Sequence, residues 1–181
     1  MSLHITFLRH GEADKSLPNH RLHPLSAKGR EQAKERRAQL GNPQFDLVIH
    51  SPLLRTKQTA CLVAGLEEDA QTIVVSDLFP QEEDPRTVVL NQAFEKLGHA
   101  SLHRYYEEAG REMQSLGNDA AREIREAINQ SNASNVLVVG HGMLLQVLCI
   151  AFTGKDNPFM DQVLNECQGC CLFGEEVTEI K

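Results

Sequence analysis

The sequence lacks the features that direct a chain into a membrane or out of the cell. Its longest apolar window, residues 136–152, contains His141 and Gln146, so a membrane span is not expected there. The short apolar run at the N-terminus leads directly into RHGE at residues 9–12, which is not the pattern of a secretory signal peptide. Without such a signal, the five cysteines are expected to be reduced thiols in a cytoplasmic protein.

The chain also lacks an excess of positive charge. Asp and Glu outnumber Lys and Arg by 25 to 18, which gives a formal net charge of −7. Nucleic acid is therefore not the expected partner, because phosphate backbones select basic protein surfaces. No G-x-G-x-x-G follows the first apolar run, which argues against a dinucleotide-binding protein. A local basic pocket is still compatible with this acidic composition.

No internal repeat, low-complexity tract or linker divides the chain. With 181 residues, 41% of them hydrophobic and 24% charged, the composition is that of an ordinary soluble globular protein with a sizeable core. We therefore expect residues 1–181 to form a single domain. Residues 85–130 are mostly helical in composition, with breaks expected near Gly98 and near Gly110 or Gly117.

Apolar runs alternate with helical patterns along most of the chain. Strands are expected at residues 2–8, 45–51, 72–79 and 135–140, and as one strand or two short ones within 167–180, with a turn at Gly174-Glu175. Helices are expected at residues 27–40, 52–64 and 143–152. Ser26 would cap the first of these helices, and Ser51 and Pro52 would begin the second. This alternation favours an α/β fold with a largely parallel sheet covered on both faces.

Basic and imidazole side chains follow three of these strands. The first strand ends in Arg9 and His10. The second is followed by a helix with Arg55 in its first turn, and the strand at 135–140 is followed by His141. Ligands bind beyond the carboxyl ends of the strands in open parallel sheets, so we expect these side chains to meet there. Two guanidiniums, two imidazoles and helix N-termini would form a strong anion site.

The expected anion is a phosphoryl group. Arginine forks match its oxygens, and a carboxylate would not need so many donors. A neutral imidazole can attack phosphorus and hold it covalently, which divides one hard displacement into two easier steps. Gly11, Gly140 and Gly142 would leave room for the backbone to approach the ligand. This chemistry requires no metal ion.

Three short motifs occur in a fixed order: LRHGEA at residues 8–13, SPLLRTKQTA at 51–60 and VVGHGMLLQ at 138–146. In this order they resemble the motifs of the histidine phosphatase superfamily, which includes cofactor-dependent phosphoglycerate mutases and many small phosphatases. HPLSAKGREQA at 23–33 resembles another block of that family, and Glu112 and Arg122 are weak matches to a further, helical block.

The resemblance implies a fold and a set of roles. The fold would be a three-layer α/β/α sandwich, phosphoglycerate mutase-like, with a mainly parallel sheet and a helical insertion at about 85–130 over the active site. His10 matches the nucleophile that becomes phosphohistidine. Arg9 and Arg55 match the phosphate-binding arginines, and His141 matches the second histidine at the phosphoryl group. The predicted phosphate-binding residues are Arg9, Gly11, Arg55, His141 and Gly142.

The general acid is the least defined part of the pattern. Relatives with a good acid carry Glu or Asp after the third strand, often in a Leu-x-Glu…Gly pattern, whereas residues 77–85 here read DLFPQEEDP without the glycine. Glu82 lies near the expected offset from Arg55 and is the first candidate, with Glu83 and Asp84 as alternatives. Some short relatives that act on protein phosphohistidine lack this acid, so the segment bears on the substrate as well.

These observations predict a metal-independent phosphomonoesterase that acts on a small phosphorylated metabolite through a phosphohistidine at His10, without a cofactor. Three alternatives stay open: a protein-phosphohistidine phosphatase of the small bacterial type, a phosphoglycerate mutase-like phosphotransferase, and a non-catalytic phosphate-binding module. The short chain and the lack of a GEWEG-like block favour hydrolysis over mutase activity. The sequence specifies neither the natural substrate nor the oligomeric state.

Other conspicuous residues are expected to be structural. Cys167, Cys170 and Cys171 resemble half of a zinc site, but no second cysteine pair or nearby histidine completes it, so core packing is expected. KGREQAKERR, residues 28–37, is expected to be a solvated helix face.

Polar residues near the motifs have the same interpretation. Glu12 is expected to cap or to form a salt bridge as readily as to function. His20, His23 and His50 are expected to be ordinary loop or strand-end residues, although His23 and Arg21 could line the mouth of the pocket.

Overall fold

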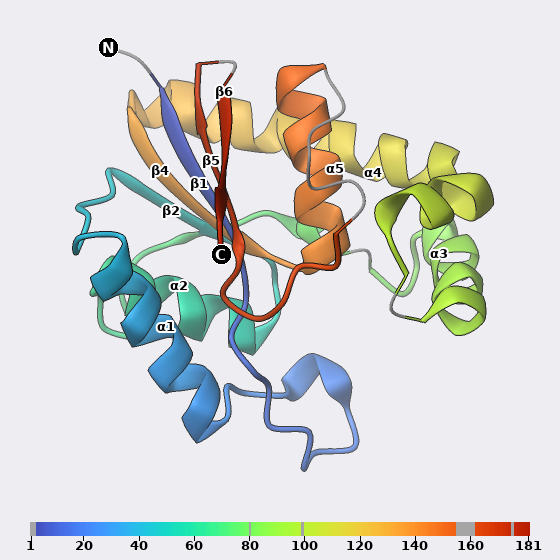
Figure 1. Ribbon diagram of the computed structural model, residues 1–181, viewed down its shortest axis with the longest axis horizontal. Helices are drawn as coiled ribbons and strands as arrows, with labels where there is room; N and C mark the ends of the chain where they lie inside the picture. Colours follow the sequence, from blue (N-terminus) through green and yellow to red (C-terminus); the bar gives the residue numbers. More distant parts are fainter. Residues whose placement is uncertain (1–2, 80, 99, 155–161, 175) are drawn as a thin grey trace.

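The computed structural model describes residues 3–79, 81–98, 100–154, 162–174 and 176–181, and these residues form a six-stranded sheet with helices on both faces (Figure 1). The strand order is β3-β2-β4-β1-β5-β6. The parallel strands are β1 (His4–Arg9), β2 (Leu47–His50), β3 (Ile73–Val74) and β4 (Asn135–Gly140). An antiparallel hairpin, β5 (Gly169–Phe173) and β6 (Glu176–Ile180), extends the sheet beside β1. The predicted mainly parallel sheet is confirmed.

Helices cover both faces of this sheet. On one face lie α1 (Ala27–Gln39) and α2 (Leu54–Ala64), and on the other lie α4 (Leu102–Ser131) and α5 (Gly142–Thr153) (Figure 1). A further helix, α3 (Pro85–Leu97), packs on α4 at one end of the molecule. The predicted three-layer α/β/α arrangement is therefore confirmed.

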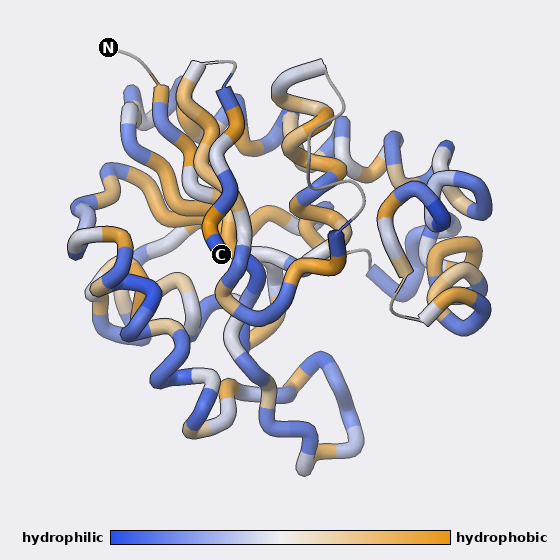
Figure 2. Tube along the Cα trace, in the orientation of Figure 1, coloured by the Kyte–Doolittle hydropathy of each residue, from blue (hydrophilic) through white to orange (hydrophobic). Residues whose placement is uncertain are grey.

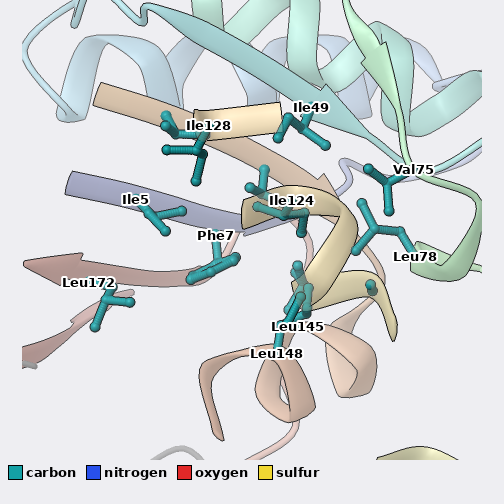
Figure 3. Close-up of a cluster of buried hydrophobic side chains, with 14 of the residues drawn as sticks. Ile5, Phe7, Ile49, Val75, Leu78, Ile124, Ile128, Leu145, Leu148 and Leu172 are labelled. Atoms are coloured by element: carbon teal, nitrogen blue, oxygen red, sulfur yellow. The ribbon is translucent and has the colours of Figure 1, made fainter. Parts of the chain in front are cut away.

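The alternation of side chains along β4 shows why the core has two halves. Val136 and Val138 face the cluster formed with α4 and α5, whereas Leu137 and Val139 face α1 and α2. All four side chains are fully buried, as expected for a central strand of a sheet covered on both sides. Figure 3 shows the cluster on the α4 and α5 side, where Ile124 of α4 lies among residues of the strands and of α5.

The outer surface of α1 is polar, as predicted. In Figure 2 this helix is largely hydrophilic, while the central strands are hydrophobic. Only Gly29 and Ala33 of α1 are buried. Ser26 caps the helix as predicted, since its hydroxyl accepts a hydrogen bond from the Gly29 backbone N–H at 3.0 Å.

The region predicted as a helical insertion, residues 85–130, has two packing environments. Its helices break at Gly98, as predicted, and bend at Ala109, next to the predicted Gly110. The first half of α4 packs against α3, but the second half, including Ile124, covers the sheet. Gly117 does not break the helix: a Cβ there would lie 2.3 Å from Val147 Cγ1, so glycine allows α4 and α5 to approach closely.

Two predicted element boundaries are wrong. The second helix begins at Leu54 rather than at Pro52, and Ser51 does not cap it, because the N-cap is Leu53 and has no side-chain cap bond. The predicted third strand is mostly irregular: only Ile73–Val74 pairs, and a 3-10 turn, η2 (Ser76–Leu78), follows it. The segment at 167–180 forms two strands, β5 and β6, which is one of the two arrangements expected for it. Gly174 lies between them with a φ of 61°, and Glu175 lies outside the described residues.

Cys167 and Cys170 pack in the core, as predicted, and Cys171 is half-buried. Burial raises the pKa of the Cys167 thiol to about 12. Over the described part of the chain, no group of three or more His, Cys, Asp or Glu side chains is placed to hold a metal ion. No helix in that part is long and apolar enough to cross a membrane.

Candidate active site

The strand order brings the predicted side chains together. β2, β4 and β1 are neighbours and parallel, so the residues that follow them lie at the same edge of the sheet. The ring of His10, after β1, lies 5.1 Å from the ring of His141, after β4. Arg55, in the first turn of α2, places its Nε 3.2 Å from His10 Nε2. Arg9, His10 and His141 line one cavity, whereas Arg55 does not line it and reaches the site through its contact with His10.

Two hydrogen bonds fix the tautomer of His10. Its Nδ1 lies 2.7 Å from the carbonyl oxygen of Gly11, which can only accept, so Nδ1 carries the proton. Its Nε2 accepts a hydrogen bond from Arg55 Nε and therefore holds a lone pair. Burial, with Arg55 and Arg9 nearby, lowers the pKa of His10 to about 3. The imidazole is thus neutral, with its nucleophilic nitrogen directed towards a guanidinium.

Arg55 is a buried cation without a carboxylate partner among the described residues. Its residue is only 8% exposed, and its other hydrogen bond runs from Nη1 to the His20 carbonyl oxygen at 2.8 Å. Burial and the nearby Arg9 lower the pKa of Arg55 to about 10. A buried guanidinium normally has an anionic partner, so this position is one where a bound anion would be stabilised.

Arg9 is partly neutralised by its surroundings. It donates hydrogen bonds to the Leu164 carbonyl oxygen and, over 3.2 Å, to Glu166 Oε1. The sequence interpretation did not include Glu166, which follows a long connection from α5. One guanidinium of the site is therefore held in place by a carboxylate, while that of Arg55 is held by uncharged acceptors.

A chain of hydrogen bonds sets the tautomer of His141. Thr56 Oγ1 donates to a backbone carbonyl oxygen, of Leu53 at 2.6 Å or Ser51 at 2.9 Å, so the Ser51 hydroxyl must donate to Thr56 Oγ1. Ser51 Oγ then accepts the remaining bond from His141 Nε2, 2.9 Å away. Burial, followed by the charges of neighbouring residues, holds the pKa of His141 well below its usual value. Ser51 thus orients the second histidine instead of capping α2.

The two glycines of the predicted phosphate-binding set differ in role. Gly142, in the first turn of α5, lines the cavity, and a Cβ there would lie 3.4 Å from Arg9 Cδ. Gly11 does not line it: its N–H donates to Thr59 Oγ1, and a Cβ would lie 2.5 Å from the Gly29 carbonyl oxygen. The prediction that Gly11 leaves room for a ligand is therefore wrong. Glycine at this position instead lets the loop after β1 pack closely against α1.

The acidic segment contains one carboxylate that reaches the cavity. Glu82 lines the cavity, and its Oε1 lies 3.9 Å from Arg21 Nε. Asp84 caps α3 and binds the guanidinium of Arg86 over 2.6 Å, and these bonds lower the pKa of Asp84. Glu83 is exposed and does not line the cavity. Of the three predicted candidates, only Glu82 is placed at the site.

Several other polar residues have structural roles. Glu12 accepts hydrogen bonds from Ser26 and Lys28 and ties the loop after β1 to α1, in line with the expected salt bridge. His50 is bonded to Ser51 and Thr72, as expected of a strand-end residue.

Of the two residues expected at the pocket mouth, Arg21 lines the cavity and His23 does not. The weak matches Glu112 and Arg122 do not line it either, and Arg122 forms an ion pair with Asp119.

The cavity itself has a volume of about 480 Å³. Sequence reasoning missed two aromatic rings in its wall, Phe79 and His20. The ring of Phe79 lies 4.8 Å from that of His141 and 6.1 Å from that of His20. The only signal in the sequence for the contact between Phe79 and His141 is that Phe79 is an aromatic residue just before the acidic segment. The wall that α3, α4 and α5 contribute gave no motif at all.

Comparison with known proteins places the chain in a family. A sequence model of the histidine phosphatase superfamily (branch 1) matches residues 5–173. No curated protein matches the chain at a significant level.

Three solved structures illustrate the likeness of fold. Phosphoserine phosphatase from Entamoeba histolytica, in complex with 3-phosphoglyceric acid, has a TM-score of 0.67 at 16% identity, over 99% of this chain and 95% of that one. Alpha-ribazole phosphatase from Shigella flexneri has a TM-score of 0.63 at 19% identity, over 98% and 95%. The protein histidine phosphatase SixA, complexed with tungstate, has a TM-score of 0.62 at 16% identity, over 99% and 95%. These similarities establish a phosphoglycerate mutase-like fold, and the match over residues 5–173 establishes that the chain belongs to the histidine phosphatase superfamily.

Proposed function

We propose that this protein is a phosphomonoesterase that hydrolyses a small phosphorylated metabolite through a phosphohistidine at His10. The observation that carries the proposal is the pairing of a neutral imidazole with the buried Arg55, which has no carboxylate partner among the described residues. A phosphoryl group supplies the anion that Arg55 lacks and the electrophile that His10 Nε2 needs. The proposal assigns catalysis to His10, Arg9, Arg55, His141 and Glu82.

In the first step His10 Nε2 attacks phosphorus while the bond to the leaving oxygen breaks. Arg55 Nε now occupies the lone pair of His10, so the incoming phosphoryl group must draw this N–H to its own oxygens before attack. Arg9, Arg55 and the first turn of α5 at Gly142 stabilise the charge on these oxygens. Glu82, protonated, gives its proton to the leaving oxygen.

His141 gains a proton as the phosphoryl group binds. Its Nε2–H is already committed to Ser51, so the ring becomes a second donor only when Nδ1 is protonated as well. The phosphoryl charge favours this imidazolium form and offsets the burial that lowers the pKa of His141 in the free site. In the second step water attacks the phosphohistidine, Glu82 accepts its proton, and phosphate leaves.

A protein-phosphohistidine phosphatase is the second candidate, and the position of Glu82 favours it. The side chain of Glu82 is 74% exposed and its nearest charged partner is Arg21, so the acid is not held against the reacting residues. An imidazole leaving group needs less help from an acid than an alkoxide does. Against this candidate stands the cavity of about 480 Å³, which suits a small molecule.

We retain a cytoplasmic location as part of the proposal, supported by the free thiols of all five cysteines.

The test is hydrolysis of p-nitrophenyl phosphate by the wild type and by His10→Ala, with EDTA present, from about pH 4.5 to 8. We expect turnover by the wild type and its loss in the variant. His4→Ala, which removes a histidine from the opposite end of β1, is the matched control and should keep its activity. Full activity in His10→Ala, or a loss on chelation that zinc restores, would contradict the mechanism. Phosphate binding without turnover in the wild type would indicate a binding module instead.

A further inference from the structure

The cavity has two chemically different ends. One end contains the reacting groups, His10 and His141, with the guanidiniums of Arg9 and Arg21. The other end extends between α3, α4 and α5 and is lined by apolar side chains: Leu90, Phe94, Tyr105, Met113, Met143 and Leu144. Its volume of about 480 Å³ falls in the range of pockets that enclose whole small molecules, so most of the space lies beyond the phosphoryl group.

Three of the four uncharged polar side chains named for the apolar end are already engaged. The Tyr105 hydroxyl donates to the Gly98 carbonyl oxygen, and the Thr87 hydroxyl donates to that of Gln81. Gln146 donates to the Gln162 carbonyl oxygen over 2.9 Å. Asn91, the remaining uncharged polar side chain that lines the described part of this end, is exposed. A leaving group rich in hydroxyls would lose its hydration here and find few partners, which is costly.

A guanidinium at the reacting end, that of Arg21, is also engaged. The guanidinium of Arg21 lies 5.1 Å above the ring of Phe79 and donates to Gln81 Oε1 over 3.0 Å. The carboxylate of Glu82 lies on the same guanidinium. A second anionic group on the substrate would therefore compete with Glu82 for Arg21. It would also lie beside the carboxyl group that the reaction uses as its acid.

From these contacts we infer that the enzyme acts on phosphate monoesters of apolar alcohols, whose hydrocarbon or aromatic group fills the space between α3, α4 and α5. The inference rests on the proposed function and specifies its substrate class. The hydrocarbon part contributes binding free energy because it leaves water on binding. Each further methylene that is buried adds a similar increment of binding free energy. The phosphoryl end fixes the orientation of the substrate, and the apolar end selects among leaving groups.

The test compares n-hexyl phosphate with glucose 6-phosphate, two esters of primary alcohols with the same number of carbons. We expect kcat/KM to be about tenfold or more higher for the hexyl ester, and to rise about two- to fourfold per methylene along ethyl, butyl and hexyl phosphate. Equal or higher kcat/KM for glucose 6-phosphate, or for 3-phosphoglycerate as an anionic ester, would overturn the inference.

Acetyl phosphate, whose leaving group is too small to reach the apolar end, separates this failure from that of the proposed function. Turnover of acetyl phosphate without preference for the hexyl ester overturns the inference alone. No turnover of acetyl phosphate or of any ester overturns both.

Two variants on α3 provide a matched comparison. Phe94, 49% exposed, lines the cavity, whereas Val88, 58% exposed, does not. Phe94→Asp should lower the ratio of kcat/KM for hexyl phosphate to that for acetyl phosphate at least about fivefold, because a carboxylate replaces the apolar wall. Val88→Asp puts the same residue in the same helix and should leave this ratio unchanged. An unchanged ratio in Phe94→Asp would contradict the proposed position of the leaving group.

Discussion

Ser51→Ala is the substitution that best tests how the site is held together. Ser51 is fully buried, and its hydroxyl donates to Thr56 Oγ1 and accepts from His141 Nε2 and, over 3.4 Å, from the backbone N–H of Leu53. Thr56 keeps its bond to a carbonyl oxygen after the change, so it loses little. His141 is left with an N–H that no longer has its acceptor.

The expected magnitude follows from the two shorter bonds, those with Thr56 and His141. The lost Ser51–Thr56 bond should lower the free energy of unfolding by about 1 kcal/mol, and the orphaned N–H should cost about 1–3 kcal/mol more if it stays buried. If the cost falls on the state in which His141 is an imidazolium, kcat/KM should drop about 5- to 150-fold. Loss of the acceptor also destabilises the charged ring, so the pKa of His141 falls further and the optimum of kcat/KM moves to lower pH.

The assay is kcat/KM against pH, with the free energy of unfolding measured in urea on the same samples. Thr6→Val is the control, because it removes a buried hydroxyl that is bonded to Cys171 and leaves the Thr56–Ser51–His141 chain of bonds intact. It should lose stability but retain most of its activity and its pH optimum. A Ser51→Ala protein with unchanged kcat/KM and pH profile would refute the role assigned to Ser51, whatever its stability.

Two further predictions concern the acid and the pH dependence of stability. Glu82→Gln should slow alkyl phosphates much more than p-nitrophenyl phosphate, since only a poor leaving group needs the proton; equal slowing of both would remove Glu82 as the acid. His10 and His141 have lowered pKa values, so the unfolded chain binds more protons, and the free energy of unfolding should fall as pH drops below about 6.5. His10 should account for at most about 1.4 kcal/mol per pH unit down to about pH 3, and urea titrations of His10→Gln should show a smaller slope. If the free energy of unfolding of His10→Gln depended on pH as steeply as that of the wild type, groups other than His10 would cause the loss of stability.

Much of the site could be predicted because it lies at strand ends. Runs such as residues 135–140 specify buried strands through their composition, and a parallel sheet brings the ends of such strands to one edge. Arg9, His10, Arg55 and His141 follow directly from this rule, without knowledge of any long-range contact. The cap at Ser26 and the helix end at Gly98 were predictable as well, since caps and breaks depend on neighbours in sequence.

The errors concern residues whose partners are distant in sequence. Gly11 packs on Gly29, and Ser51 binds His141, which follows the neighbouring strand β4. A helix cap was a reasonable local interpretation of Ser51, but the tertiary contact with His141 prevailed. Gly117 similarly serves the contact with Val147 rather than a break.

The sequence by itself determined the layered α/β fold, the family and the four side chains, Arg9, His10, Arg55 and His141, that follow the ends of the parallel strands. Only the tertiary structure decided which nitrogen of His10 is free, which carboxylate of the acidic segment reaches the cavity, and what fills the space beyond it. The physical reason is that hydrophobic periodicity and caps are local properties of the chain. Protonation, hydrogen-bond partners and the apolar wall between α3, α4 and α5 depend on side chains that only the folded arrangement brings together.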